Sequence, residues 1–151
     1  MAELKERLRA DLNAAMRARD QVRMRTLRLA LTSITNEEVA GATARDLTDD
    51  EIVRVLTREA RKRREAAEAF SAAGRADQAA AERAEGEILA DYLPAQLSDD
   101  ELAALVDAAI TETGASSMAS MGQVMKTVTP RVAGRADGAR VAAEVRRRLS
   151  G

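Results

Sequence analysis

The side chains with most scope for chemistry are cations in the last third of the chain, because the sequence contains neither histidine nor cysteine. Without those two residues the commonest general base, the commonest transition-metal ligand and every Ser-His or Cys-His nucleophile are absent. Residues 118–151 hold seven cations and two carboxylates, whereas residues 98–117 hold five carboxylates and no cation. We therefore expect no catalytic residue, no metal site and no cofactor, but a basic C-terminal end.

Glycines beside these cations suggest a phosphate-binding site. Gly134 and Gly138 flank Arg135 and Asp137 at the start of the last predicted helix, where backbone N–H groups near cations bind phosphate readily. A tight interhelical turn explains these two glycines equally well. Gly122 costs about 1 kcal/mol relative to Ala inside a predicted helix, so close packing or ligand approach would explain it. The candidate site residues are Lys126, Arg131, Arg135, Arg140, Gly122, Gly134 and Gly138.

Other charged or polarisable groups also have an ordinary structural interpretation. The run Arg61–Arg64 spreads around a helix among glutamates, so a solvated helix is the favoured interpretation. The acidic pairs at 49–50 and 99–100 each follow a capping hydroxyl, where the helix dipole favours carboxylates. The spacing of the methionines at 118, 121 and 125 favours a core over a groove for a partner helix. Five further arginines are explained equally well as a positive functional surface or as residues that keep the protein soluble: Arg17, Arg19, Arg23, Arg25 and Arg28.

The elements that carry these residues are predicted to be helices. Hydrophobic residues make up 46% of the chain, yet Phe70 and Tyr92 are its two aromatic residues, and few glycines and prolines interrupt it. Apolar side chains recur at helical spacing, and capping boxes at Thr48–Glu51 and Ser98–Glu101 mark two helix starts. We predict an all-α fold with an N-terminal bundle of about four helices and a small C-terminal three-helix domain.

Local signals set the predicted boundaries. Pro94 disfavours helical geometry at the residue before it, which divides the chain into an N-terminal domain 1–93, a linker 94–97 and a C-terminal domain 98–151. Asp20 and Asp137 are predicted helix caps. The helix that begins near Ser117 is expected to turn residues 118, 121, 125 and 128 inward and to end at Pro130. Glycines are expected to end three other helices: Gly41, Gly74 and Gly114.

The first residues are charged and lead into no apolar segment of a secretory signal, and no later run approaches transmembrane length. The sequence therefore predicts a cytoplasmic protein that does not associate with membranes.

Several short motifs, in order along the chain, resemble two related protein groups. Residues 122–127 (GQVMKT), 134–136 (GRA), Val141 and Leu149 resemble the C-terminal tail of GatB, the B subunit of the tRNA-dependent amidotransferase. The whole chain resembles the YqeY family of small proteins similar to this tail. The motifs that carry this second resemblance are 26–28 (TLR), 36–38 (NEE), 63–65 (RRE), 73–75 (AGR), 92–94 (YLP), 96–97 (QL), 114–118 (GASSM) and 134–138 (GRADG).

The resemblance implies two helical domains, with a C-terminal domain like the module that approaches tRNA in the amidotransferase. It also implies kinship with carbon-nitrogen ligases that use glutamine as amido-N-donor. The kinase and transamidation sites of that enzyme have no counterpart in these residues, so no independent activity is expected.

Two functions follow as hypotheses. The first is an accessory protein that binds tRNA or is linked to tRNA-dependent amidation, with amidotransferase subunits or a tRNA synthetase as further candidate partners and no DNA expected. The residues listed above as the candidate site would be the RNA-binding residues. The alternative is a protein-protein adaptor of an amidotransferase or another translation-related complex, with no direct RNA contact.

Overall fold

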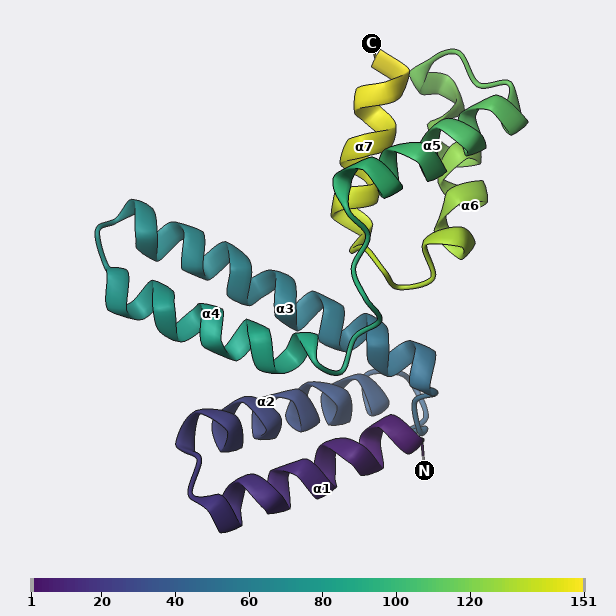
Figure 1. Cartoon of the computed structure of the whole chain (residues 1–151). Helices are drawn as coiled ribbons and strands as arrows, with labels where there is room; N and C mark the ends of the chain where they lie inside the picture. Colours follow the sequence, from purple (N-terminus) through teal and green to yellow (C-terminus); the bar gives the residue numbers. More distant parts are fainter. Residues whose placement is uncertain (1, 151) are drawn as a thin grey trace. The chain divides into compact units, whose positions relative to one another are not determined.

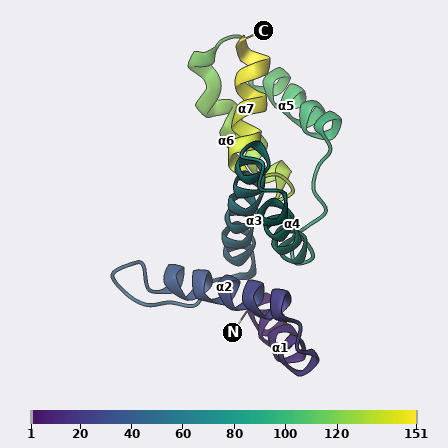
Figure 2. The same ribbon diagram turned by 90° about the vertical axis from the view of Figure 1, so that its left-hand side faces the viewer.

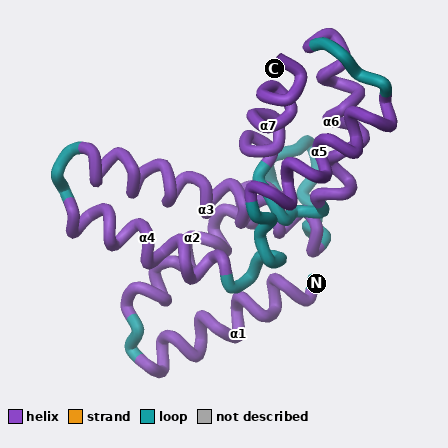
Figure 3. The backbone as a smooth tube through the Cα atoms, turned by 45° about the horizontal axis from the view of Figure 1, so that its top comes forward, coloured by secondary structure: helices purple, strands orange, loops and turns teal. Residues whose placement is uncertain are grey.

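The computed structural model describes residues 2–150, and in that range it is helical without any β-strand, which confirms the predicted all-α class (Figure 3). Contacts between helices divide the chain into two compact units, Met1–Leu93 and Pro94–Gly151. No helix among the described residues is long and apolar enough to cross a membrane. The elements are α1 (Glu3–Ala18), α2 (Gln21–Glu38), α3 (Asp49–Ala72), α4 (Ala76–Ala90), α5 (Asp99–Thr113), a 3-10 turn η1 (Met118–Ser120), α6 (Met121–Val132) and α7 (Gly138–Ser150).

The N-terminal unit consists of two antiparallel hairpins, α1–α2 and α3–α4, which cross one another (Figures 1 and 2). Helix α2 contacts α1 as well as α3 and α4, so its apolar face fills the crossing. With so few aromatic residues, aliphatic side chains supply most of this core. The core residues are Leu8, Leu27, Ala30, Ile34, Leu47, Ile52, Val55, Leu56, Leu89 and Tyr92.

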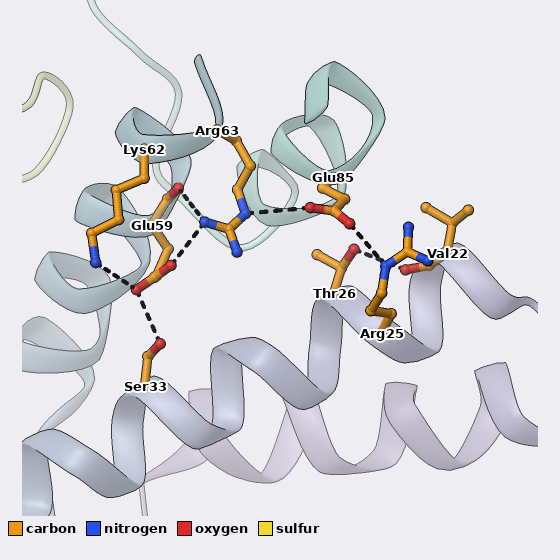
Figure 4. Close-up of polar contacts among 8 residues, drawn as sticks. All are labelled: Val22, Arg25, Thr26, Ser33, Glu59, Lys62, Arg63 and Glu85. Carbon is orange, nitrogen blue, oxygen red and sulfur yellow. Dashed lines mark hydrogen bonds and ion pairs between the residues drawn. The ribbon is translucent and has the colours of Figure 1, made fainter. Parts of the chain in front are cut away.

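A chain of charged side chains ties α2, α3 and α4 together (Figure 4). Arg63 of α3 donates from Nη1 to Glu59 Oε2 at 3.0 Å, and its Nε lies 3.5 Å from Glu85 Oε2 of α4. Helix α2 is bonded to both ends of this chain of side chains. Ser33 donates to Glu59 at 3.0 Å, and Arg25 Nε donates to Glu85 at 3.0 Å. Because Glu59 is buried and Arg63 is mostly buried, breaking one link leaves an uncompensated charge inside the unit.

The run Arg61–Arg64 is therefore less uniformly solvated than its sequence predicts. Lys62 is exposed and lies 3.4 Å from Glu59, as expected for a solvated helix with interleaved charges. Arg63, by contrast, points between the helices. Close approach of α3 and α4 makes this possible, since a Cβ at Gly86 would lie 3.7 Å from the Cβ of Arg63.

A second buried ion pair holds α1 against the end of α2. Lys5 Nζ donates to both oxygens of the Glu38 carboxylate, at 2.8 and 2.9 Å, and both residues are buried. Glu38 also accepts the Leu47 N–H at 3.4 Å, so one carboxylate joins α1, α2 and the segment before α3. The hydrogen bond from Lys5 is the main reason that the pKa of Glu38 lies below its ordinary value of 4.5.

Tyr92 joins α1 to the chain just after α4. Its ring is buried, its hydroxyl donates to the Asp11 carboxylate, and the Arg7 guanidinium lies 4.5 Å from the ring centroid. Burial is the main cause that raises the pKa of Tyr92 to about 12, with the Asp11 carboxylate acting in the same direction. Tyr92 thus firmly anchors the end of the N-terminal unit to α1.

Most predicted helix ends are confirmed. Thr48 and Ser98 both form complete capping boxes, at the starts of α3 and α5, and Asp20 accepts the Arg23 N–H at the start of α2. Asp137 accepts the Arg140 N–H at 2.9 Å and so caps α7. Gly74 and Gly114 adopt the predicted left-handed conformation after α3 and α5, whereas α2 ends at Glu38, ahead of Gly41.

The C-terminal unit packs α5, α6 and α7 around an aliphatic core, and Leu97, in the segment predicted as a linker, is part of it. The Leu97 N–H donates to the Arg135 carbonyl at 2.7 Å, so this segment follows the C-terminal unit. The buried residues are Leu97, Leu102, Val106, Ala109, Val124, Val128, Val132, Ala136, Val141, Val145 and Leu149.

The predicted inward face of α6 is confirmed for Val128, confirmed only in part for Met121 and Met125, and wrong for Met118, and the predicted end at Pro130 is wrong. The helix turns a valine face inward at 124, 128 and 132, whereas Met118 lies in the preceding 3-10 turn with 43% of its surface exposed, and Met121 and Met125 are only partly buried. The helix also continues past Pro130 to Val132, because a proline in the last turn removes one hydrogen bond while burial of Val132 stabilises that turn.

We predict that Lys5→Met lowers the free energy of unfolding by about 3 kcal/mol at neutral pH, because it leaves the buried Glu38 carboxylate without its partner. The folded-state pKa of Glu38 is lowered, so the contribution of the pair is complete above the ordinary pKa of 4.5. It disappears as the pH falls through the lower folded-state pKa. The difference between wild type and variant should therefore shrink in acid, measured by urea unfolding followed by circular dichroism.

Lys62→Met is the matched control. Its ammonium is mostly exposed, and Ser33 and Arg63 still bond Glu59 without it, so its loss should change the free energy of unfolding by less than about 1 kcal/mol. Equal effects of the two substitutions at neutral pH would contradict the role assigned to Lys5.

Candidate nucleic-acid interface

Three of the four predicted phosphate-contacting cations face carboxylates of α5. Arg140 Nη2 lies 2.9 Å from Asp99 Oδ1, and Arg135 Nη2 lies 3.7 Å from Glu101 Oε2. The Arg131 guanidinium pairs with Glu112, and this pairing lowers the pKa of that carboxyl. We call Asp99, Glu101 and Glu112 the α5 carboxylates. Carboxylates of the acidic segment 98–117 thus form ion pairs with arginines of the basic segment 118–151.

This pairing corrects the expectation of a basic C-terminal end. Residues 98–151 carry seven cations and seven carboxylates, so the net charge of the C-terminal unit is zero. Arg147 and Arg148 add to the compensation, because both bond Glu144 on their own helix, and Arg148 also lies 3.0 Å from Asp107. Long-range electrostatic attraction of a polyanion is therefore weak in this unit.

Arg135 and Arg140 are the two predicted site residues that the fold brings together. Both reach the first turn of α5, where Asp99 and Glu101 are adjacent to the Ser98 cap. The Arg135 Nε donates to the Ala95 carbonyl at 2.9 Å, which fixes the side chain while leaving its Nη groups directed at Glu101. The Ser98 N–H is the main cause of the lowered pKa of Glu101.

Arg131 and Lys126 lie elsewhere in the unit. Glu112, the partner of Arg131, is thirteen residues beyond Asp99 on α5, a distance of about 20 Å along the helix. Lys126 is exposed and forms no ion pair with any residue that the structure describes. It is five residues from Arg131, which places the two about 140° apart around α6. The four cations therefore do not form one continuous surface.

The three glycines of the candidate site differ from one another. Gly134 has φ +79° and follows Ala133, also left-handed at φ +52°, so the turn between α6 and α7 requires its conformational freedom. Gly122 and Gly138 are exposed in the first turns of α6 and α7, and a Cβ on either would meet no atom within 4 Å. The structure therefore rules out close helix packing as the reason for Gly122 among the described residues.

The α5 carboxylates are the residues that sequence reasoning missed as parts of this site. Asp99 was interpreted only as a helix-dipole partner, although its side chain is 98% exposed and pairs with Arg140. The signal was present, since an acidic helix followed by basic helices in a domain of this size brings opposite charges together. Among residues 2–150 no group of three or more carboxylates lies close enough to hold a metal ion.

We predict opposite effects of alanine at these glycines on the free energy of unfolding. Gly134→Ala should lower it by about 1–2 kcal/mol, because a Cβ disfavours the left-handed conformation. Gly122→Ala and Gly138→Ala should raise it by up to about 1 kcal/mol, because both sites are open and helical. Thermal unfolding followed by circular dichroism measures all three. A loss of stability in Gly122→Ala would mean that the glycine has a packing role after all.

Two comparisons with known proteins complete the description of the chain. A search of curated proteins gives no match. The sequence profile of the family described as Yqey-like protein matches residues 5–149, which include every helix except the ends of α1 and α7. A match of this extent covers both units and all the candidate site residues. The chain therefore belongs to the Yqey-like protein family.

Proposed function

We propose that this protein is an accessory tRNA-binding protein linked to tRNA-dependent amidation, without a complete active site of its own. Family membership and the resemblance of the C-terminal segment to the GatB tail support this proposal. The observation that carries it is the pair Arg135 and Arg140, which lie together at the start of α5 and are held by exposed carboxylates. A bound RNA would contact this pair with its phosphates.

In this mechanism, phosphates replace the α5 carboxylates. Exposed ion pairs contribute only about 0–1 kcal/mol each, so a phosphate that contacts two guanidinium groups can displace Asp99 and Glu101. Until then the carboxylates hold the arginine side chains extended, which lowers the entropy that the side chains lose on binding RNA. The bond from Arg135 to the Ala95 carbonyl acts in the same way.

Such a surface recognises shape and phosphate rather than base sequence. Residues 94–151 contain no aromatic side chain, so the C-terminal unit has none on which a base could stack. The number of cations involved is also small, and each contact to duplex RNA contributes roughly one unit to the slope of log K against log salt. The proposed role is therefore to increase affinity within a larger complex.

We predict that Asp99→Asn combined with Glu101→Gln increases affinity for tRNA by about threefold to tenfold at low salt, because the substitutions remove the carboxylates that compete with the phosphates for Arg140 and Arg135. Arg135→Glu combined with Arg140→Glu should lower affinity by at least about tenfold and flatten the salt dependence. Filter binding of labelled tRNA over a salt series measures both effects.

The matched control for the first variant is Asp77→Asn with Glu87→Gln. This pair removes the same charge from exposed positions on α4 and should change affinity by less than about twofold. Equal gains in the two double variants would show that overall charge, and not the α5 carboxylates, limits binding. No tRNA binding at low salt, together with partner proteins that remain bound after RNase treatment, would favour the adaptor function instead.

A further inference from the structure

Positive charge in the N-terminal unit is concentrated around the turn between α1 and α2. Residues 16–28 contain five arginines and one carboxylate, a net charge of +4, while the other residues of 1–93 have a net charge of −5. The one carboxylate, Asp20, caps α2 by accepting the Arg23 N–H at 3.1 Å. A unit that is slightly acidic as a whole therefore has one distinctly basic end.

These arginines differ from those of the C-terminal unit because most of them have no carboxylate partner. Within the described residues, Arg17, Arg19, Arg23 and Arg28 form no ion pair. Arg25 is the exception and reaches Glu85 on α4 (Figure 4). Arg135 and Arg140 each face a carboxylate, whereas four of the five arginines of residues 16–28 form no ion pair within residues 2–150.

The stability of the hairpin does not explain this composition. Arg19 has φ +57°, a left-handed conformation that costs an arginine roughly 1 kcal/mol and that glycine or asparagine adopts more easily. Arg23 lies in the first turn of α2, where the helix dipole disfavours cations. Both features oppose local stability, and such conflicts are expected where a surface has a binding role.

Apolar side chains are exposed at the same place. Met16, Val22 and Leu29 have 44%, 38% and 38% of their surface exposed, and they make up three of the five large hydrophobic residues exposed in the described chain. Val22 and Leu29 are seven residues apart and so lie on one side of α2, about 10 Å apart. Met16 and Val22 flank the two-residue connection between the helices.

We propose that the α1–α2 turn surface docks an acidic amphipathic helix of a partner protein. We define this surface by six residues: Met16, Arg17, Arg19, Val22, Arg23 and Leu29. Arginine and methionine are enriched at protein interfaces, where the first pairs with carboxylates and the second adapts to apolar side chains. The unpaired arginines select a partner with negative charge. The exposed aliphatic side chains select one that also buries an apolar face.

A helix is a better fit than an RNA backbone. A phosphate backbone gains nothing from aliphatic side chains, and base stacking requires aromatic rings, which the α1–α2 turn surface lacks. The spacing of Val22 and Leu29 matches two turns of a partner helix with apolar residues at i, i+3 or i+4, and i+7. Acidic residues beside that stripe would then reach the arginines.

The test uses a synthetic peptide of about 18 residues, roughly five helical turns, with leucine at helical spacing and glutamate at most other positions. Fluorescence anisotropy measures its affinity for the full-length protein, and NMR of ¹⁵N-labelled protein locates it. We expect binding with shifts confined to residues 16–29. Arg17→Gln, Arg19→Asn and Arg23→Gln together should weaken it by at least about tenfold, while asparagine at 19 also relieves backbone strain and keeps the fold intact.

Matched variants separate the surface from overall charge and hydrophobicity. Arg54→Gln, Arg75→Gln and Arg83→Gln remove three exposed arginines from α3, α4 and their connection, and should change peptide affinity by less than about twofold. Met16→Gln with Val22→Gln should weaken binding by about tenfold, whereas Val39→Gln with Met118→Gln, which alter exposed residues of the same two types elsewhere, should not.

Three results would overturn the proposal. One is equal affinity for a peptide of the same composition with its leucines scattered around the helix, since that would show charge attraction alone. Another is a uridine RNA that binds the same residues as tightly as the peptide. The third is peptide binding that the arginine and apolar variants leave unchanged. None of these bears on tRNA binding by Arg135 and Arg140, which is measured separately.

Discussion

Buried ion pairs between helices are the interaction on which the arrangement of the N-terminal unit depends. With one phenylalanine and one tyrosine, the chain packs helices through small and aliphatic side chains, and such faces fit one another in several registers. Charged contacts restrict the choice. The register of α3 against α4 is fixed by the contacts among Glu59, Arg63 and Glu85. The register of α1 against α2 is fixed in the same way by Lys5 and Glu38. A shifted register would leave these charges buried without partners, at a cost of several kcal/mol.

The helices themselves follow from local signals in the sequence, whereas the candidate site does not. Thr48, Ser98 and Asp137 cap helices through atoms three residues away, so a short stretch of chain contains all the information. The partners of Arg135 and Arg140 lie 34 and 41 residues earlier, at Glu101 and Asp99. No local sequence pattern shows that residues so far apart in the chain are in contact. The arginines could therefore be identified from the sequence, but their carboxylate partners could not. The valine face of α6 shows the same limit, because packing against α5 and α7 decides which of its apolar residues reach the core.

The two basic regions of the chain consequently have different physical properties. In the C-terminal unit every cation of the α5 contacts already has a partner, so an incoming anion must compete for it. At the α1–α2 turn there is no such competition, and apolar side chains lie among the charges. Counting charges along the sequence would have ranked these regions in the opposite order, because the count includes cations whose charge is cancelled in space.

The contact between Tyr92 and Asp11 has a practical consequence for optical work on this protein. The chain has no tryptophan, and Tyr92 is its one tyrosine, so its near-ultraviolet emission comes from a single phenol in the N-terminal unit. A carboxylate that accepts a hydrogen bond from the phenol hydroxyl quenches that emission, and separation of α1 from the end of α4 would restore the emission. Tyrosine fluorescence therefore reports on the N-terminal unit alone. The opening of that unit can be followed in the intact chain without a signal from the C-terminal unit.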